Sequence, residues 1–273
     1  MDLTIPPSRL LEQSLDYPGT FALKSAALTD GELKDLASTQ DVKISEIRAP
    51  LSLITPPTLF FFASVHGASL YSLNLQNTKI DGPMLQSLSE LLPNLRSLSL
   101  QYLHDISDSH VRDVVVKCTQ LHEIHFSQNR KLSKNLFFFL LSQSRSFSVI
   151  SLDLANNFPM PDNFVFSASI KELLLIGPAF NDQDSLVFSK AHPDKLELSL
   201  TKFKSEGIRE LLVNCEHSQH VITIIINELF QKRLKELHKN LLTVHSTRLF
   251  EFKKEPTSLT IILKPLKLIE FGI

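Results

Sequence analysis

Apolar side chains recur along the chain in short alternating runs, separated by a nearly constant distance. The pattern Leu-x-x-Leu-x-Leu is clearest over residues 70–75 and again over residues 95–100. The middle apolar residue of each run serves as a marker, and there are ten: Phe21, Ile47, Leu73, Leu98, Ile124, Leu152, Leu173, Leu198, Ile224 and Phe250. Successive markers are 26, 26, 25, 26, 28, 21, 25, 26 and 26 residues apart. A period of this length predicts a repeat protein with one strand per run.

Each alternating run is followed by a turn and then by a segment whose apolar positions have helical spacing. Such segments cover residues 81–92, 107–116, 133–141, 205–213 and 228–242. Thr29 and Glu32 have the spacing of a capping box, which predicts a further helix start. One strand and one helix cannot bury their apolar faces alone, so we expect the repeats to stack around one continuous core.

The repeat around residue 100 resembles a known family. It combines Leu-Arg-Ser-Leu-Ser-Leu at 95–100, Ile-Ser-Asp at 106–108 and Lys-Cys-Thr-Gln-Leu at 117–121. This is similar to the cysteine-containing leucine-rich repeats of the ribonuclease-inhibitor type, and Cys215 has the same place in a later repeat. The resemblance implies an α/β fold, a right-handed solenoid or horseshoe with a parallel β-sheet on the concave face and helices on the convex face.

The same resemblance implies a single domain over residues 1–273. Residues 1–19 form an N-terminal cap, residues 20–253 form about ten repeats, and residues 254–273 form a C-terminal cap. Within the caps we expect a short amphipathic helix over 8–15 and closing strands over 259–263 and 266–271. Pro159 and Pro161 break any helix in the repeat where the spacing is irregular.

Strand alternation predicts which side chains lie on the concave face, because successive side chains point to opposite faces. The markers align Asp153 with Leu174 and Ser199, and Ser151 with Glu172 and Glu197. The predicted partner-binding residues are acidic, imidazole and aliphatic side chains on this face: Glu123, His125, Asp153, Glu172, Leu174, Ile176, Glu197 and Ile225. Aliphatic residues among polar ones indicate an interface core. The alternative is that the C-terminal segment covers them, or that the register is slightly different.

The group Glu123, His125 and Asp153 also has the side-chain chemistry of a metal or acid-base site. However, no zinc-binding, nucleophile-elbow or phosphate-loop motif accompanies it. The sequence therefore favours a row of solvent-exposed polar side chains across neighbouring strands. It predicts a binding protein that is not an enzyme, with no catalytic, cofactor-binding or metal-binding residues. Recognition of a basic loop of a partner is a further interpretation of these acidic groups.

Three other features have a structural and a functional interpretation. Cys118 and Cys215 are expected to pack between helix and strand, with reactive thiols as the alternative. The phenylalanine runs 60–62 and 137–139 fall in helical segments, where three consecutive side chains cannot all face inward. Some ring edges should be exposed, either between neighbouring helices or as a convex contact patch. The stretch 231–236 mixes lysine, arginine and glutamate, which favours a solvated helix face over a nucleic-acid contact.

Composition narrows the class of partner. The 273 residues are 43% hydrophobic and 21% charged, with a formal net charge of -1, so there is no basic field for nucleic acid. No apolar run approaches the ~20 residues of a membrane helix, and the N-terminus does not resemble a signal peptide. Two distant cysteines fit a reducing compartment. We therefore expect a cytoplasmic protein with protein partners, while its oligomeric state stays open.

The sequence thus predicts a scaffold that binds a protein partner on its concave face. One alternative is a bacterial effector secreted into a host cell, which would then act in the host cytoplasm on a host protein. Another is a substrate-recognition subunit of a ubiquitin ligase, as in related F-box proteins. Residues 1–19 are too few to hold an F-box, so that subunit would join its ligase through another chain.

Overall fold

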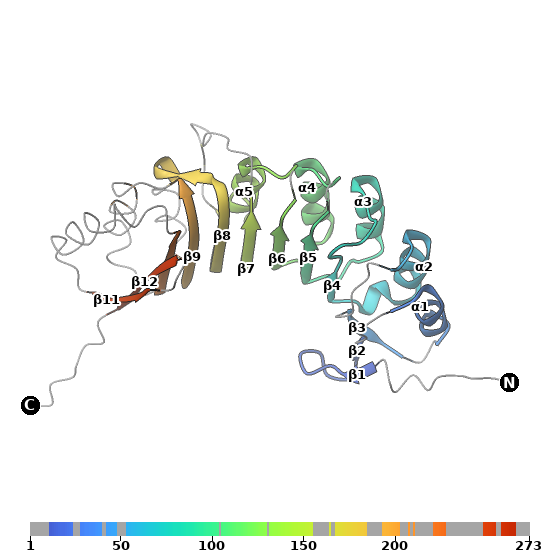
Figure 1. Cartoon of the computed structure of the whole chain (residues 1–273). Coiled ribbons are helices and arrows are strands. Elements are labelled where there is room, and N and C mark those ends of the chain that lie inside the picture. The colour runs from blue at the N-terminus through green and yellow to red at the C-terminus, as the bar shows by residue number, and fades with distance from the viewer. Residues whose placement is uncertain are drawn as a thin grey trace, which may run out of the picture. The chain divides into compact units, whose positions relative to one another are not determined.

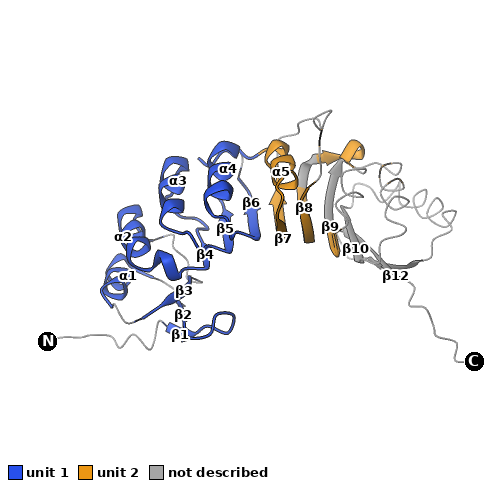
Figure 2. Ribbon diagram, turned by 180° about the vertical axis from the view of Figure 1, so that it is seen from behind, with its two compact units in different colours: residues 1–132 blue, residues 133–273 orange. Residues whose placement is uncertain are grey.

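The computed structural model describes most of the N-terminal half and selected elements beyond it. The described residues are 11–23, 28–39, 42–47, 53–103, 105–129, 131–154, 164, 167–184, 193–202, 207, 210, 221–227, 248–254 and 258–265. In them strands alternate with helices in an α/β fold whose strands are mostly parallel. The chain divides into two compact units, residues 1–132 (unit 1) and residues 133–273 (unit 2), which Figure 2 colours separately.

Unit 1 alternates short strands with short helices. Its elements are β1 (Leu11–Gln13), β2 (Phe21–Leu23), α1 (Asp30–Ala37), β3 (Ile44–Ile47), α2 (Pro56–His66), η2 (Gly67–Ser69), β4 (Ser72–Asn74), α3 (Gly82–Glu90), β5 (Ser97–Gln101), α4 (Asp108–Lys117) and β6 (Glu123–Ser127). Strands β2 to β6 pair in chain order and run parallel, whereas β1 pairs antiparallel with β2. Helices α1 to α4 lie along one face of these strands (Figure 1).

The strand register in unit 1 follows the sequence markers from the second repeat onward. Ile47 pairs with Leu73, Leu73 with Leu98, and Leu98 with Ile124, and all four side chains are buried. The first marker was wrong by two residues. Leu23, which is fully buried, pairs with Ile47, whereas Phe21 is 37% exposed.

A left-handed residue after β4, β5 and β6 repeats the same period. Asn77, Tyr102 and Gln128 have φ angles of 56°, 59° and 57°, and they follow β4, β5 and β6. Positive φ is rare outside glycine, and asparagine tolerates it better than a bulky tyrosine. Three repeats therefore share one backbone turn regardless of the side chain that occupies it.

The start of α1 confirms the capping-box prediction, and the starts of α3 and α4 are capped as well. Thr29 and Glu32 cap α1 reciprocally, and the Asp81 carboxylate accepts a hydrogen bond from the Met84 backbone N–H at 2.9 Å. Ser107 caps α4 together with the imidazole of His110. That imidazole also lies directly against Gly82, where an added Cβ would be 1.9 Å from its Nδ1 atom. Gly82 thus allows α3 and α4 to approach closely.

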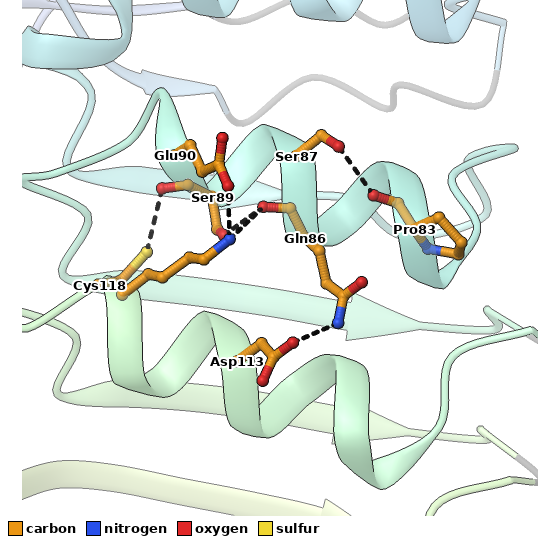
Figure 3. A network of polar contacts seen from close by, with 8 residues as sticks. Pro83, Gln86, Ser87, Ser89, Glu90, Asp113 and Cys118 are labelled. Carbon is orange, nitrogen blue, oxygen red and sulfur yellow. Dashed lines mark hydrogen bonds and ion pairs between the residues drawn. The ribbon is translucent and has the colours of Figure 1, made fainter.

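Polar contacts link α3 and α4 along their length (Figure 3). The Lys117 ammonium is 2.7 Å from the Glu90 carboxylate, and the Gln86 amide donates to Asp113. The Cys118 thiol donates to the backbone carbonyls of Ser89 and Leu92 at 3.9 Å and 3.6 Å. Cys118 is fully buried, in agreement with the packing prediction, while Cys215 lies outside the described residues.

The N-terminal segment is a hairpin, so the prediction of a helix over residues 8–15 was wrong for its described part. Strand β1 and strand β2 are joined by a turn that contains Gly19 at φ 79°. The turn is tied to the next strand, because Ser14 donates to the Glu46 carboxylate and Thr20 donates to Ser45 at 2.7 Å. Backbone pairing with β2 outweighs the amphipathic pattern that favoured a helix.

An aromatic and arginine cluster holds the hairpin turn against the sheet. The rings of Tyr17 and Tyr71 have centroids 4.5 Å apart, and the Arg96 guanidinium lies 4.8 Å from the Tyr71 centroid. Burial raises the pKa of the Tyr17 phenol, and the Arg96 charge partly offsets that rise. The cation stacked on both rings therefore links the hairpin to two repeats.

Unit 2 begins with a helix and continues with longer strands. Its described elements are α5 (Lys134–Leu141), β7 (Ser146–Asp153), β8 (Ser169–Asn181), η3 (Asp182–Asp184), β9 (Lys195–Lys202), β10 (Val221–Asn227), β11 (Arg248–Lys254) and β12 (Ser258–Pro265). Strands β7 to β10 pair in chain order and run parallel. The predicted closing strand over residues 259–263 is confirmed within β12, which pairs antiparallel with β10.

Two sequence assignments in unit 2 were wrong. The run around Phe250 was expected to be a tenth parallel strand, but β11 pairs antiparallel with β12 and forms a terminal hairpin. The seventh marker was set at Leu173, whereas Leu175 is the residue that pairs with Leu152 and with Leu198. Three consecutive leucines, residues 173–175, made the two registers equally plausible in the sequence.

Helix α5 contacts the end of β8 through phenylalanine rings and a buried ion pair. The Lys134 ammonium is 2.8 Å from both carboxylate oxygens of Asp184, and each side chain is only 2% exposed. The rings of Phe138 and Phe180 lie 6.0 Å and 5.9 Å from that ammonium. The pair fixes the β8–η3 turn against the first turn of α5.

The phenylalanine runs have the mixed orientation that helix geometry predicts. In α2, Phe62 is buried while Phe61 is exposed, and in α5 Phe137 and Phe138 are buried while Phe139 is partly exposed. Helices of this kind turn 100° per residue, so three consecutive rings cannot share one face. The prediction of an exposed ring edge is confirmed at Phe61.

Candidate functional site

The exposed side of strands β7, β8 and β9 forms a mixed aliphatic and acidic surface, which we call the unit 2 face. Three cross-strand rows can be followed from the register: Val149–Glu172–Lys195, Ser151–Leu174–Glu197 and Asp153–Ile176–Ser199. Except for Ser199, whose side chain lies outside the described residues, these side chains are partly or well exposed. The strands concerned are labelled in Figure 1.

The centre of this face carries two aliphatic side chains on β8. Leu174 is partly exposed and Ile176 is 42% exposed, whereas Leu173 and Leu175, which alternate with them, are buried on the opposite side. The buried side is where α5 contributes Leu136, Phe137 and Leu140 to the core. The alternation therefore leaves an aliphatic pair on the outer side of β8, while the described leucines on its inner side are buried.

Charged groups surround this aliphatic pair. The Lys195 ammonium lies 3.4 Å from the Glu172 carboxylate, and both side chains are 44% exposed. Glu197 is the register partner of Leu174, and Asp153 is the register partner of Ile176. The described side chains of the unit 2 face therefore include three carboxylates and one ammonium.

The exposed side of β5 and β6 in unit 1 has a different chemistry. Glu123 and His125 on β6 pair with Ser97 and Ser99 on β5, and all four side chains are partly exposed. Burial lowers the pKa of His125, and the Glu123 carboxylate partly opposes this effect. The surface presents hydroxyl groups, one carboxylate and a largely neutral imidazole at neutral pH.

The predicted site residues are thus distributed over both units. Glu123 and His125 belong to unit 1, while Asp153, Glu172, Leu174, Ile176 and Glu197 belong to the unit 2 face. Leu174 aligns with Ser151 and Glu197, which corrects the alignment of Ser151 with Glu172 expected from the sequence. Ile225 pairs with Ser199 through the backbone, but its side chain lies outside the described residues.

The sequence analysis missed Val149 and Lys195 on this face. Each is two residues before a residue that was assigned to it, so the same alternation could have identified both. It also missed the cluster of Tyr17, Tyr71 and Arg96, since residues that far apart carry no shared pattern. Among the residues the structure describes, no three or more His, Cys, Asp or Glu side chains are grouped to hold a metal ion.

Comparison with known proteins gives no relative from which a function could be transferred. No protein-family model matches the chain, and no curated protein is significantly similar to it. Within the described part of the chain, every helix is too short or too polar to cross a bilayer.

Proposed function

We propose that this protein is a leucine-rich-repeat solenoid that acts as a scaffold and binds a protein partner on its exposed sheet face. The observation that carries the proposal is the aliphatic pair Leu174 and Ile176 on the outer side of β8. Apolar side chains at the centre of a polar surface are typical of interface cores, since a partner removes them from water. The partner-binding residues of this proposal are the pair and the acidic groups around it on the unit 2 face.

Three features of unit 1 support the assignment to leucine-rich repeats. The buried markers Ile47, Leu73, Leu98 and Ile124 are in register across parallel strands. A left-handed residue follows three successive strands, and Cys118 bonds to the carbonyls at the end of the preceding helix. The first two features return with the sequence period, as stacked repeats require.

The sheet face suits recognition because its side chains stand on a rigid frame. Strand β8 is hydrogen-bonded on both sides, to β7 and to β9, and its inner side chains are buried. A partner that docks there orders few side chains of the scaffold, so little conformational entropy is lost on binding. The residues around Leu174 and Ile176 can form a polar rim that excludes water from the centre.

The experiment that tests this function compares capture of proteins by two double variants. Leu174→Asp with Ile176→Asp places charges on the unit 2 face, and Val65→Asp with Val116→Asp places them on exposed helix positions of α2 and α4. Affinity capture with quantitative mass spectrometry then follows for the natural chain and both variants, each checked by circular dichroism. We expect that at least one protein is captured by the natural chain and by the Val65→Asp and Val116→Asp variant. The Leu174→Asp and Ile176→Asp variant should fail to capture that protein. Equal capture by both folded variants would contradict the proposal.

A further inference from the structure

A tyrosine and an arginine lie side by side where two neighbouring strands of unit 1 begin. Tyr71 is the residue before β4, and Arg96 is the residue before β5. The Arg96 backbone N–H donates to the Tyr71 carbonyl at 2.8 Å, and the Tyr71 N–H donates to the Ser45 carbonyl of β3 at 2.7 Å. Backbone hydrogen bonds therefore fix both residues at the same edge of the sheet.

The hairpin turn between β1 and β2 adds a second tyrosine at this edge. The Tyr17 and Tyr71 ring centroids are 4.5 Å apart, and the Arg96 guanidinium is 4.8 Å from the Tyr71 centroid and 5.7 Å from that of Tyr17. The Tyr17 N–H donates to the Ser14 hydroxyl at 3.1 Å, and the Thr20 N–H donates to the Tyr17 carbonyl at 3.2 Å. The guanidinium thus lies against two rings whose backbones are both hydrogen-bonded.

The Arg96 side chain is exposed, and the described part of the chain leaves its N–H groups unused. Among the described residues it contacts the two tyrosine rings but forms no ion pair and donates no side-chain hydrogen bond. The five N–H donors of a guanidinium lie at its edge in one plane, so contact with aromatic rings leaves donors for another group. Such a planar fork is complementary to the two oxygens of a carboxylate.

The charges around the cluster favour an anion at the guanidinium. Burial raises the pKa of Tyr17, and Arg96 opposes this rise more strongly than any single carboxylate near it supports it. Three carboxylates contribute to the rise, in decreasing order Glu123, Glu46 and Asp16. A carboxylate of a partner gains the attraction of Arg96, and these three groups reduce that gain, so the preference for one acidic side chain should be modest.

We propose that Tyr17, Tyr71 and Arg96 form a second recognition site, which binds the carboxylate of an aspartate or glutamate side chain on a partner protein. Arg96 donates two parallel hydrogen bonds to the carboxylate, and the tyrosine rings hold the guanidinium in position. Tyrosine and arginine are also enriched among the residues that dominate binding energy at protein interfaces. The site belongs to unit 1 and shares no residue with the unit 2 face.

Two peptides that differ in one functional group test the inference without a known partner. The probe is acetyl-Gly-Glu-Leu-Gly-amide, and the control peptide has glutamine in place of glutamate. NMR of the isotope-labelled full chain follows the Nε–H signal of Arg96, which is assigned by its absence in Arg96→Lys. We expect the probe to shift this signal saturably and to bind about fivefold more tightly than the control at low salt. The difference should shrink as salt is added.

Protein variants separate recognition from a purely structural role of the cluster. Arg96→Gln removes the guanidinium, so the preference for the glutamate peptide should disappear. Arg96→Lys keeps the charge without the planar fork, and we expect it to lose most of the preference. Lys79→Gln is the matched control, because it removes an exposed cation of unit 1 outside the cluster and should leave the preference unchanged. Circular dichroism confirms that each variant is folded.

Several results would overturn the inference. On the natural chain these are equal binding of the two peptides, binding of neither, or binding that leaves the Arg96 signal in place, and none of them depends on a variant. A preference that survives in Arg96→Gln, or that is undiminished in Arg96→Lys, would also contradict it. Failure here leaves the proposed function intact, since the capture test concerns Leu174 and Ile176.

Discussion

The strands of both units pair mostly in chain order, but the two units expose different side chains on their sheet surfaces. The strands of unit 1 have three to five residues, and its exposed β5 and β6 positions carry serine, glutamate and histidine. Strands β7 to β10 of unit 2 have 8, 13, 8 and 7 residues, and the face they support carries an aliphatic pair. A shared backbone period therefore determines where side chains point, while individual residues determine what each surface can bind.

The units also differ in how their elements are fixed. In unit 1, helix caps, the Gly82–His110 approach and the stacked Arg96 hold successive repeats together. In unit 2, a buried ion pair links α5 to the turn after β8. The following predictions test this contrast, from the largest expected effect on stability to the smallest.

The largest effect is expected at the buried ion pair of unit 2. Lys134→Ala leaves the Asp184 carboxylate buried without its cation, so we expect a loss of about 3–5 kcal/mol in the free energy of unfolding, measured in urea. Lys117→Ala removes an exposed ion pair with Glu90 in unit 1 and should cost no more than about 1 kcal/mol. Equal costs for the two variants would show that Lys134 is not held as described.

A smaller effect is expected where α3 meets α4. Gly82→Ala drives a methyl group into the His110 imidazole, which we expect to cost about 1–3 kcal/mol of unfolding free energy. Gly31→Ala is the matched control, since nothing lies within 4 Å of its added Cβ and alanine favours helix α1 by up to about 1 kcal/mol. In a His110→Ala background the cost of Gly82→Ala should disappear, and a cost that persists would contradict the close approach.

The left-handed position after β5 predicts a gain in stability. Tyr102 has φ 59° and is 39% exposed, so Tyr102→Gly relieves backbone strain while it removes a side chain that is only partly buried. We expect the free energy of unfolding to rise by about 1 kcal/mol. Asn77→Gly at the equivalent position should change it little, because asparagine tolerates this conformation. A loss of stability in Tyr102→Gly would indicate that the tyrosine ring contributes more than the strain costs.

Acid is expected to weaken unit 1 through its histidines. Burial lowers the pKa of His66 below 6.5, although its contact with the Leu36 carbonyl opposes the shift, and burial also lowers the pKa of His125. The unfolded chain then binds more protons than the folded chain, so stability falls as the pH drops through 6.5 and is retained above it. Urea midpoints at about pH 7.5 and 5.5 measure the fall.

His66→Gln identifies the share of that pH dependence that comes from α2. The substitution removes the titrating ring, so the difference between the two midpoints should be smaller in the variant than in the natural chain. A natural chain whose stability is the same at both pH values, or greater in acid, would rule out this origin.

The elements that local sequence determines were predicted well. The starts of α3, α4 and α5 follow from Asp81, Ser107 and Ser133, whose side chains cap the helix beginning at the next residue. The sequence also predicted which side chains of β7, β8 and β9 lie on the unit 2 face, because alternation within one strand determines which side chains share a side.

Features that depend on distant pairing were not predictable in the same way. Lys134 and Asp184 are 50 residues apart, and no local pattern connects them. The register of β8 was ambiguous because a shift of two residues keeps every leucine on its own side of the sheet. Periodicity gives the position of the run around Phe250 but not its neighbour in the sheet, because β12 lies between β10 and β11 and pairs antiparallel with both.

The most direct test of the account is the affinity of the captured partner for three purified chains. These are the natural chain, the Leu174→Asp and Ile176→Asp variant, and the Val65→Asp and Val116→Asp variant. If the aliphatic pair is the interface core, only the first variant should bind much more weakly, by at least about tenfold for two lost anchors. Affinities that fall equally in both variants, or in neither, would contradict a partner site on the unit 2 face.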